Sequence, residues 1–214
     1  MVTHGKKLVG IYLAAGSSRR MGTAKQCLEL AEGISLGGIA LTEALHSELE
    51  QVIVVVRKGD TLGWLPEEAH GHISSGRCRI AECQDADLGM AYSLRTGIQE
   101  AEALGAEGAL VMLADQPFID GAMLGRLRDG FSEGEGYDFI ASGDKGVPKP
   151  PVILARGMWP AVAVLEGDAG ARSLFQLPAY RGQIIEEAEQ LKFMDIDTVE
   201  RYEKAVKIFK HHFM

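Results

Sequence analysis

The sequence predicts an α/β fold with a doubly wound, mostly parallel sheet. Short apolar runs alternate along the chain with segments of helical periodicity, and the connections between them are short. The strongest strand signal is residues 51–57, QVIVVVR, where five consecutive apolar residues suit a strand that is covered on both faces. Alternation of this kind is typical of βαβ units packed around one sheet.

The remaining elements follow the same pattern. We expect further strands at residues 6–15, 77–83, 108–114, 137–143, 152–155, 182–188 and 192–196. We expect helices at residues 35–48, 61–69, 89–104, 120–130 and 157–165, and a C-terminal helix from Thr198. No internal repeat or linker is evident, so one domain over residues 1–214 is the expectation.

Charge, hydropathy and cysteine content argue against a nucleic-acid-binding, membrane or secreted protein. The net charge is −8, which argues against a partner such as nucleic acid or a membrane surface, because those call for a basic footprint. No apolar run approaches the roughly 20 residues of a membrane span, and the N-terminal residues do not resemble a signal peptide. The three cysteines form no CxxC pair. We therefore expect a soluble cytoplasmic protein with reduced thiols.

Residues 13–25, LAAGSSRRMGTAK, follow the first expected strand. Glycine backbone, hydroxyl donors and cations are combined in this loop, at Gly16, Gly22, Ser17, Ser18, Arg20 and Lys25. Ligands of open parallel sheets bind beyond the carboxyl ends of the strands, so the loop is a candidate polyphosphate site. Its spacing fits neither the P-loop nor the dinucleotide fingerprint. The alternative is a solvated basic connection.

Carboxylates come from two other places. Asp115, in LADQP (113–117), follows the expected strand 108–114 and would lie at the same edge of the sheet, where it suits Mg²⁺ beside phosphate. The alternative is an Asp that caps the turn before Pro117. Asp195 and Asp197 alternate along an extended segment and could supply a second carboxylate. Alternatively, Asp197 caps the final helix.

The stretch LGMAYSLRTG (88–97) is a candidate for base and ribose recognition. Gly89 would let the backbone approach a flat ligand, and Ser93 lies one turn into the expected helix. The start of an ordinary amphipathic helix is the alternative.

These residues together resemble a known family. LAAGSSRRMGTAK closely resembles the signature L-A-A-G-x-S-x-R-M-G-x-x-K of the MobA-like nucleotidyltransferases. GMAYSLRTG, LADQP, PPVILARGMWP, GDAGARSLF and DIDTVERYEKA resemble, in the same order, motifs of its molybdenum cofactor cytidylyltransferase branch. The resemblance implies a nucleotide-diphospho-sugar-transferase-like domain. Such a domain has a largely parallel seven-stranded sheet and a small antiparallel element near the C-terminus.

The resemblance also implies a reaction, the Mg²⁺-dependent transfer of a nucleotide from an NTP to a phosphorylated acceptor with release of pyrophosphate. Leu13, Ala14, Ala15, Gly16 and Ser17 would surround the nucleotide, with Gly22, Gly89 and Ser93. Arg20 and Lys25 would bind the triphosphate, and Asp115 would bind the metal together with Asp195 or Asp197. The acceptor side would be formed by Gly167, Asp168, Gly170 and Arg172.

The first motif also bears on the base and the acceptor. Cytidylyl-transferring relatives tend to have L-A-A-G, as here, where guanylyl-transferring ones have L-A-G-G. The resemblance therefore implies CTP, a molybdopterin-type acceptor and a molybdenum hydroxylase as recipient. Ser35 and Lys149-Pro150-Pro151 depart from the family's Gly-x-Pro and Gly-His-Pro. A sugar 1-phosphate or methylerythritol phosphate acceptor, or a non-catalytic cofactor-binding accessory protein, are the alternatives.

Overall fold

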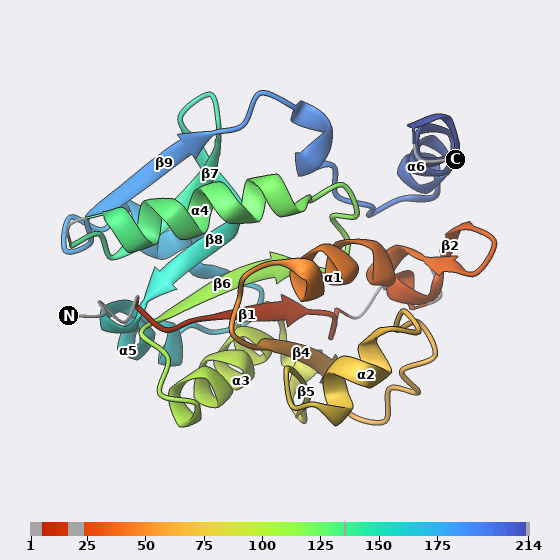
Figure 1. Cartoon of the computed structure of the whole chain (residues 1–214). Helices are drawn as coiled ribbons and strands as arrows, with labels where there is room; N and C mark the ends of the chain where they lie inside the picture. The colour runs from red at the N-terminus through yellow and green to blue at the C-terminus, as the bar shows by residue number, and fades with distance from the viewer. Residues whose placement is uncertain (1–5, 17–23, 135, 213–214) are drawn as a thin grey trace.

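A computed structural model describes residues 6–16, 24–134 and 136–212. Its centre is a seven-stranded sheet in the order β5-β4-β1-β6-β8-β7-β9 (Figure 1). The strands are β1 (Leu8–Leu13), β4 (Val52–Arg57), β5 (Cys78–Cys83), β6 (Gly108–Leu113), β7 (Phe139–Asp144), β8 (Val147–Ala155) and β9 (Gly182–Glu186). All pairs are parallel except those of β8, which runs antiparallel to both β6 and β7. The predicted doubly wound, mostly parallel sheet is confirmed.

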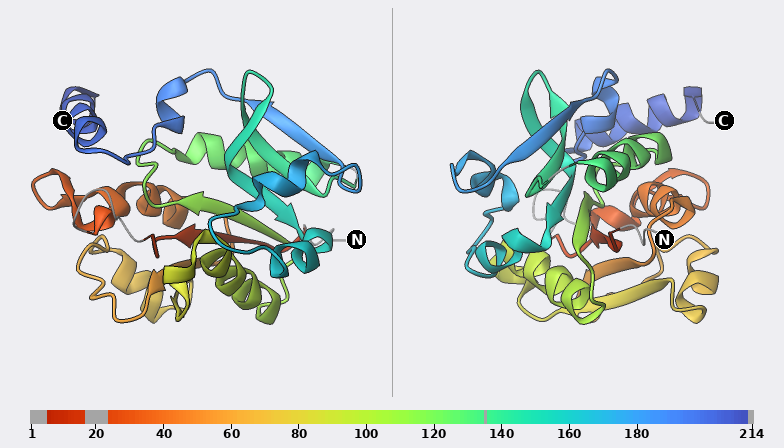
Figure 2. Two further views of the ribbon diagram at one scale, coloured as in Figure 1. Left: turned by 180° about the vertical axis from the view of Figure 1, so that it is seen from behind. Right: turned by 60° about the vertical axis from the view of Figure 1, so that its left-hand side comes forward.

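Helices cover both faces of the sheet (Figures 1 and 2). One face packs against α1 (Leu36–His46), α2 (Ala69–Ser74) and α4 (Gly121–Glu133), the other against α3 (Met90–Ala103) and α5 (Trp159–Ala163). Alternate residues of β1 enter the two cores, since Tyr12 belongs to the first and Ile11 to the second. This double burial explains why the strands read as apolar runs.

A third, smaller core lies beside the sheet. It joins the hairpin of β2 (Glu29–Ala31) and β3 (Ile34–Ser35) to the C-terminal helix α6 (Val199–His212), which lies over β2 (Figures 1 and 2). The hydroxyl of Tyr202 on α6 donates to the carbonyl oxygen of Glu29 (2.6 Å). The sequence did not predict this hairpin.

Ser35, at the position where the family pattern has proline, caps α1. Its Oγ accepts a hydrogen bond from the backbone N–H of Gly38 (3.1 Å). A side-chain cap satisfies one of the helix's unpaired N–H groups, so the substitution preserves the start of the helix.

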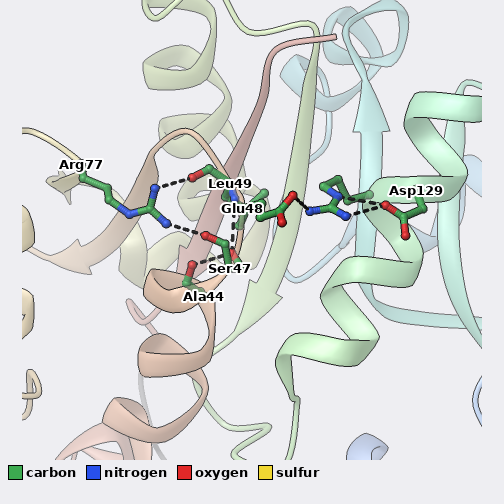
Figure 3. A network of polar contacts seen from close by, with 7 residues as sticks. Ala44, Ser47, Glu48, Leu49, Arg77 and Asp129 are labelled. Carbon is green, nitrogen blue, oxygen red and sulfur yellow. Dashed lines mark hydrogen bonds and ion pairs between the residues drawn. The ribbon is translucent and has the colours of Figure 1, made fainter. Parts of the chain in front are cut away.

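The other end of α1 is held by Arg77 (Figure 3). The guanidinium donates hydrogen bonds to three carbonyl oxygens, those of Leu45 (2.8 Å), Ser47 (2.5 Å) and Leu49 (2.9 Å). The last carbonyls of a helix lack partners within it and attract a cation. Arg128 of α4 contacts Glu48 and Asp129 and so ties α4 to the same connection.

Three expected elements differ from the structure. No strand forms at 192–196, where a 3₁₀ helix at Gln190–Phe193 leads into extended chain, because Lys192 turns inward to Asp120. The helix expected at 61–69 is replaced by turns before α2, where Asp60 accepts from the N–H of Leu62 (2.8 Å). Strand β8 begins at Val147, earlier than expected, because it forms a hairpin with β7. The other 3₁₀ helices of the described chain are Lys25–Cys27, Ala86–Leu88, Arg156–Met158 and Ala171–Gln176.

None of the helices in the described part of the chain is long and apolar enough to cross a membrane.

Candidate active site

A pocket of about 530 Å³ lies beyond the carboxyl ends of β1 and β6. The two strands pair in parallel, and the N–H of Ala114 still donates to the carbonyl oxygen of Leu13 (3.1 Å) past the end of β6. Ten of the residues predicted for the site line this pocket: Leu13, Ala14, Ala15, Gly16, Lys25, Gly89, Ser93, Asp115, Asp168 and Asp197. The pocket is therefore where an open parallel sheet binds its ligands.

Lys25 lies between two carboxylates. Its Nζ is 2.9 Å from Oδ2 of Asp115 and 2.7 Å from Oδ1 of Asp197. Burial by itself would lower the pKa of Lys25, but the two carboxylates outweigh it and raise the pKa above its usual value. The ammonium is therefore charged at neutral pH. Three segments supply the group: the 3₁₀ helix after the first loop, the end of β6 and the residues before α6.

Asp115 has a second oxygen with a different environment. Its Oδ1 is buried and has no hydrogen-bond partner among the residues that the structure describes. A buried carboxylate oxygen left unpaired is costly, and a cation at this oxygen would relieve the cost. Asp115 and Asp197 thus fit a Mg²⁺ ion, which commonly takes one or two carboxylates plus phosphate and water oxygens. Within the described ranges, no three His, Cys, Asp or Glu side chains converge as a complete metal site.

Asp195 differs from Asp197. Its Oδ1 accepts a hydrogen bond from Nε2 of Gln116 (2.8 Å), and it does not line the pocket. Burial raises the pKa of Asp195, and the charges of Asp115 and Asp197 raise it further. Thr198 caps α6, since its Oγ1 accepts from the N–H of Arg201 (3.3 Å). Of the two carboxylates, Asp197 is the one that faces Lys25.

Residues 10–186 match the family described as the MobA-like NTP transferase domain. The chain belongs to this family. As a member of the MobA-like family, it is a nucleotidyltransferase, and the predicted family resemblance is confirmed.

Two relatives cover nearly the whole chain. Purine catabolism protein PucB of Bacillus subtilis (strain 168) is 37% identical over 200 residues, which are 92% of this chain and 94% of that protein. Nicotine blue oxidoreductase of Paenarthrobacter nicotinovorans is 28% identical over 199 residues, 91% and 94% of the two chains.

Solved structures share the fold. A Mycobacterium tuberculosis Rv0371c homolog from Mycobacterium sp. strain JC1 superposes with a TM-score of 0.78 at 27% identity, covering 96% of this chain and 98% of that one. Rv0371c of Mycobacterium tuberculosis H37Rv, in complex with manganese, has a TM-score of 0.70 at 21% identity, covering 94% and 99%.

In this MobA-like protein, Gly89 is explained by a backbone contact. Its φ is 124°, and a Cβ placed there would lie 2.3 Å from the carbonyl carbon and oxygen of Gly167. The N–H of Ala91 donates to the same Gly167 oxygen (3.0 Å). The loop around 167 is thus held against the start of α3, and its Asp168 lines the pocket.

The other predicted residues divide into two groups. Gly167, Gly170 and the exposed Arg172 are not part of the described pocket lining, although Gly170 approaches Met90 at its rim. Ser17, Arg20 and Gly22 lie outside the described residues, so their predicted roles stay predictions. Among the described lining residues, Lys25 is the one cation, and the carboxylates are those of Asp87, Asp115, Asp168 and Asp197.

Two buried glutamines near the site were not predicted. Gln26 lines the pocket and donates from Nε2 to Oδ2 of Asp60 (3.1 Å), which anchors the short helix that carries Lys25. Gln116 bonds Asp195. Gln116 stands within LADQP. The partners of the two glutamines, Asp60 and Asp195, are not their neighbours in the sequence, so the local sequence pattern could not predict these hydrogen bonds.

Proposed function

We propose that this nucleotidyltransferase transfers CMP from CTP to a molybdopterin-type molybdenum cofactor and releases pyrophosphate. The observation that carries the proposal is the contact of Lys25 with Asp115 and Asp197 at a pocket lined by residues 13–16 and 113–115. A charged lysine and paired carboxylates at a strand-end pocket are the groups that phosphoryl chemistry requires.

Asp115 and Asp197 would hold Mg²⁺, which when bound neutralises charge on phosphate oxygens. The buried, unpaired Oδ1 of Asp115 supports this assignment, and so does the manganese bound by Rv0371c. Lys25 offsets only part of the charge of the four carboxylates that line the pocket, and divalent cations would offset more of it when a triphosphate binds.

In the proposed reaction a phosphate oxygen of the acceptor forms a bond to the α-phosphorus of CTP. The bond from that phosphorus to the bridging oxygen of the β-phosphate breaks, and the electron pair leaves with pyrophosphate. Lys25, together with Arg20, would bind the triphosphate and stabilise the charge that develops on it. Ser17 and the backbone at Gly16 and Gly22 would donate further hydrogen bonds to it.

The nucleotide is proposed to be CTP. Ala15 is buried and its methyl group lies in the pocket wall, where it takes space beside the base. Less space favours a pyrimidine, and Gly89 and Ser93 line the same pocket. Calorimetry with CTP and GTP, each with and without Mg²⁺, tests base and metal together. We expect CTP to bind more tightly than GTP, and Mg²⁺ to increase the affinity for CTP. Tighter binding of GTP, or an affinity that is unchanged by Mg²⁺, would contradict the proposal.

The acceptor side is proposed to include Gly167, Asp168, Gly170 and Arg172. A panel of CTP, GTP and UTP against molybdenum-loaded molybdopterin, sugar 1-phosphates and methylerythritol phosphate, read by pyrophosphate release, identifies the acceptor. Turnover only with another acceptor would keep the chemistry and overturn the cofactor assignment.

The alternative is a non-catalytic accessory protein that binds the same molybdenum cofactor but transfers no nucleotide to it. Asp115→Ala separates the two: we expect it to abolish transfer and leave acceptor binding intact. An unchanged function would favour the accessory protein. In either case we propose a cytoplasmic molybdenum hydroxylase as the recipient of the cofactor.

A further inference from the structure

Two segments that lie far apart in the sequence are joined beside the pocket. Residues 115–120 follow β6, and residues 187–197 precede α6. Three contacts connect them: the N–H of Ile196 to the carbonyl oxygen of Asp115 (2.9 Å), Gln116 Nε2 to Asp195 Oδ1 (2.8 Å), and Lys192 Nζ to Asp120 Oδ2 (2.8 Å). The position of the second segment is therefore set by the first.

Gln116 is the side chain at the centre of this junction. It is only 3% exposed, and within the described chain its Oε1 has no hydrogen-bond partner. A buried amide with one of its polar atoms unpaired costs stability. The bond that it does make runs from its Nε2 to Oδ1 of Asp195 (2.8 Å). An apolar side chain of the same size would fill the space but would not hold Asp195.

Holding Asp195 also fixes Asp197. Successive side chains of an extended segment alternate in direction. Ile196 is fully buried in the core formed with β2 and α6, which leaves Asp195 to Gln116 and Asp197 to Lys25. The segment is thus fixed on both sides immediately before the carboxylate that enters the pocket.

We propose that Gln116 is a positioning residue: through Asp195 it holds Asp197 against Lys25 and Asp115. Asp195 is then a support that contacts no metal, and an asparagine there would serve as well, because its carbonyl oxygen still accepts from Gln116. The inference rests on the proposed function in that Asp197 is taken as a metal ligand.

The test measures Mn²⁺ affinity by electron paramagnetic resonance of the free ion, and hydrogen exchange of the Ile196 amide without metal or nucleotide. The variants are Gln116→Leu, Asp195→Asn and Asp197→Asn. Gln183→Leu, at a partly buried glutamine of β9 that does not line the pocket, is the control for replacing a glutamine by leucine. Circular dichroism confirms that each variant is folded.

We expect Gln116→Leu to weaken Mn²⁺ binding about ten-fold, as loss of a residue supporting a ligand does. We expect it to speed exchange at Ile196 on the order of ten-fold. Asp195→Asn should stay within about two-fold of the unmodified protein in both measurements, whereas Asp197→Asn should weaken Mn²⁺ binding without changing exchange.

Unchanged Mn²⁺ affinity in folded Gln116→Leu would overturn the inference, and so would a loss in Asp195→Asn equal to that in Asp197→Asn. Absence of Mn²⁺ binding by the unmodified protein would overturn it too. Neither readout involves CTP or turnover. If only the proposed cytidylyl transfer is wrong, transfer activity will be missing, while Mn²⁺ affinity and Ile196 exchange will still change as expected in the variants.

Discussion

Side chains in the pocket contact residues that are far away in the sequence. Lys25 contacts carboxylates 90 and 172 residues further along the chain. Its charge offsets theirs in a half-buried place, so its removal leaves Asp115 and Asp197 facing each other. The ammonium of Lys25 that is proposed to bind the triphosphate is therefore also the charge that balances the two carboxylates.

Lys25→Ala tests that dependence. We expect kcat to fall roughly 10²–10³-fold, because a group that stabilises developing phosphate charge is lost. Steady-state pyrophosphate release with the confirmed nucleotide and acceptor measures it. Lys58→Ala, an exposed lysine in the connection after β4, is the control and should leave kcat unchanged. A fall in kcat of less than two-fold for Lys25→Ala would show that this lysine does not stabilise the developing charge.

Gly89→Ala tests the contact between α3 and the loop at 167. The new methyl would overlap the Gly167 carbonyl, so the loop that carries Asp168 must move. We expect a loss of about 1–3 kcal/mol in the free energy of unfolding and weaker CTP binding. Gly59→Ala separates the causes, since Gly59 also has a positive φ (74°) but nothing within 4 Å of its Cβ position. Equal losses in the two variants would show that backbone conformation, not the contact, matters.

The ends of the helices hold the elements that surround the pocket. Asp120 caps α4 through the N–H of Met123 (2.8 Å) and pairs with the buried Lys192 of the segment before Asp195. Burial alone would raise the pKa of Asp120. The hydrogen bonds from Lys192 and Met123 outweigh it and lower the pKa below its usual value. One carboxylate thus stabilises a helix and a neighbouring segment together.

The pH dependence of Asp120→Ala follows from that shift. A carboxyl whose pKa is lowered by folding contributes stability above its unfolded pKa and loses it as pH falls through the lower, folded value. At pH 7 we expect a loss of about 1–2 kcal/mol in the free energy of unfolding. Urea titrations should show the difference from the unmodified protein shrinking below about pH 4. Asp129→Ala, an exposed residue of the same helix, should change little. A difference that is constant with pH would contradict the assignment.

At the scale of the whole molecule, the two cores of the sheet were predictable and the third was not. Apolar runs such as 52–56 identify strands whatever they contact, because both faces are buried. The two short strands of the β2–β3 hairpin read as a loop, and their stability comes from α6, more than 160 residues away. The assignment of 192–196 was wrong because the buried ammonium of Lys192 pairs most closely with Asp120 (2.8 Å), a residue distant in the sequence.

The candidate site divides in the same way. Lys25 and Asp115 were predictable, because the ends of parallel strands share one edge of a sheet. The choice between Asp195 and Asp197 depended on a hydrogen bond to Gln116, and the need for glycine at 89 depended on Gly167. Contacts of this kind arise from the packing of distant segments, about which a local pattern says nothing.

Phe209→Ala tests the third core. Phe209 is buried where α6 meets β2, and we expect a loss of about 3 kcal/mol in the free energy of unfolding. Ile196 belongs to the same core, so its amide should also exchange faster. Val164→Ala, at an exposed valine, is the control. A stability loss with unchanged exchange at Ile196 would show that α6 packs independently of the segment before it.

The contact of Lys25 with Asp197 has a consequence for synthesis on the ribosome. Residues of β1 and the first loop emerge long before Asp197, which follows Lys25 by 172 residues. Until that carboxylate is translated and docked, the lysine lacks its contact with Asp197. Contacts between such distant residues form slowly. A nascent chain can therefore acquire its sheet before it can acquire a closed pocket, and nucleotide binding would report that translation has passed residue 197.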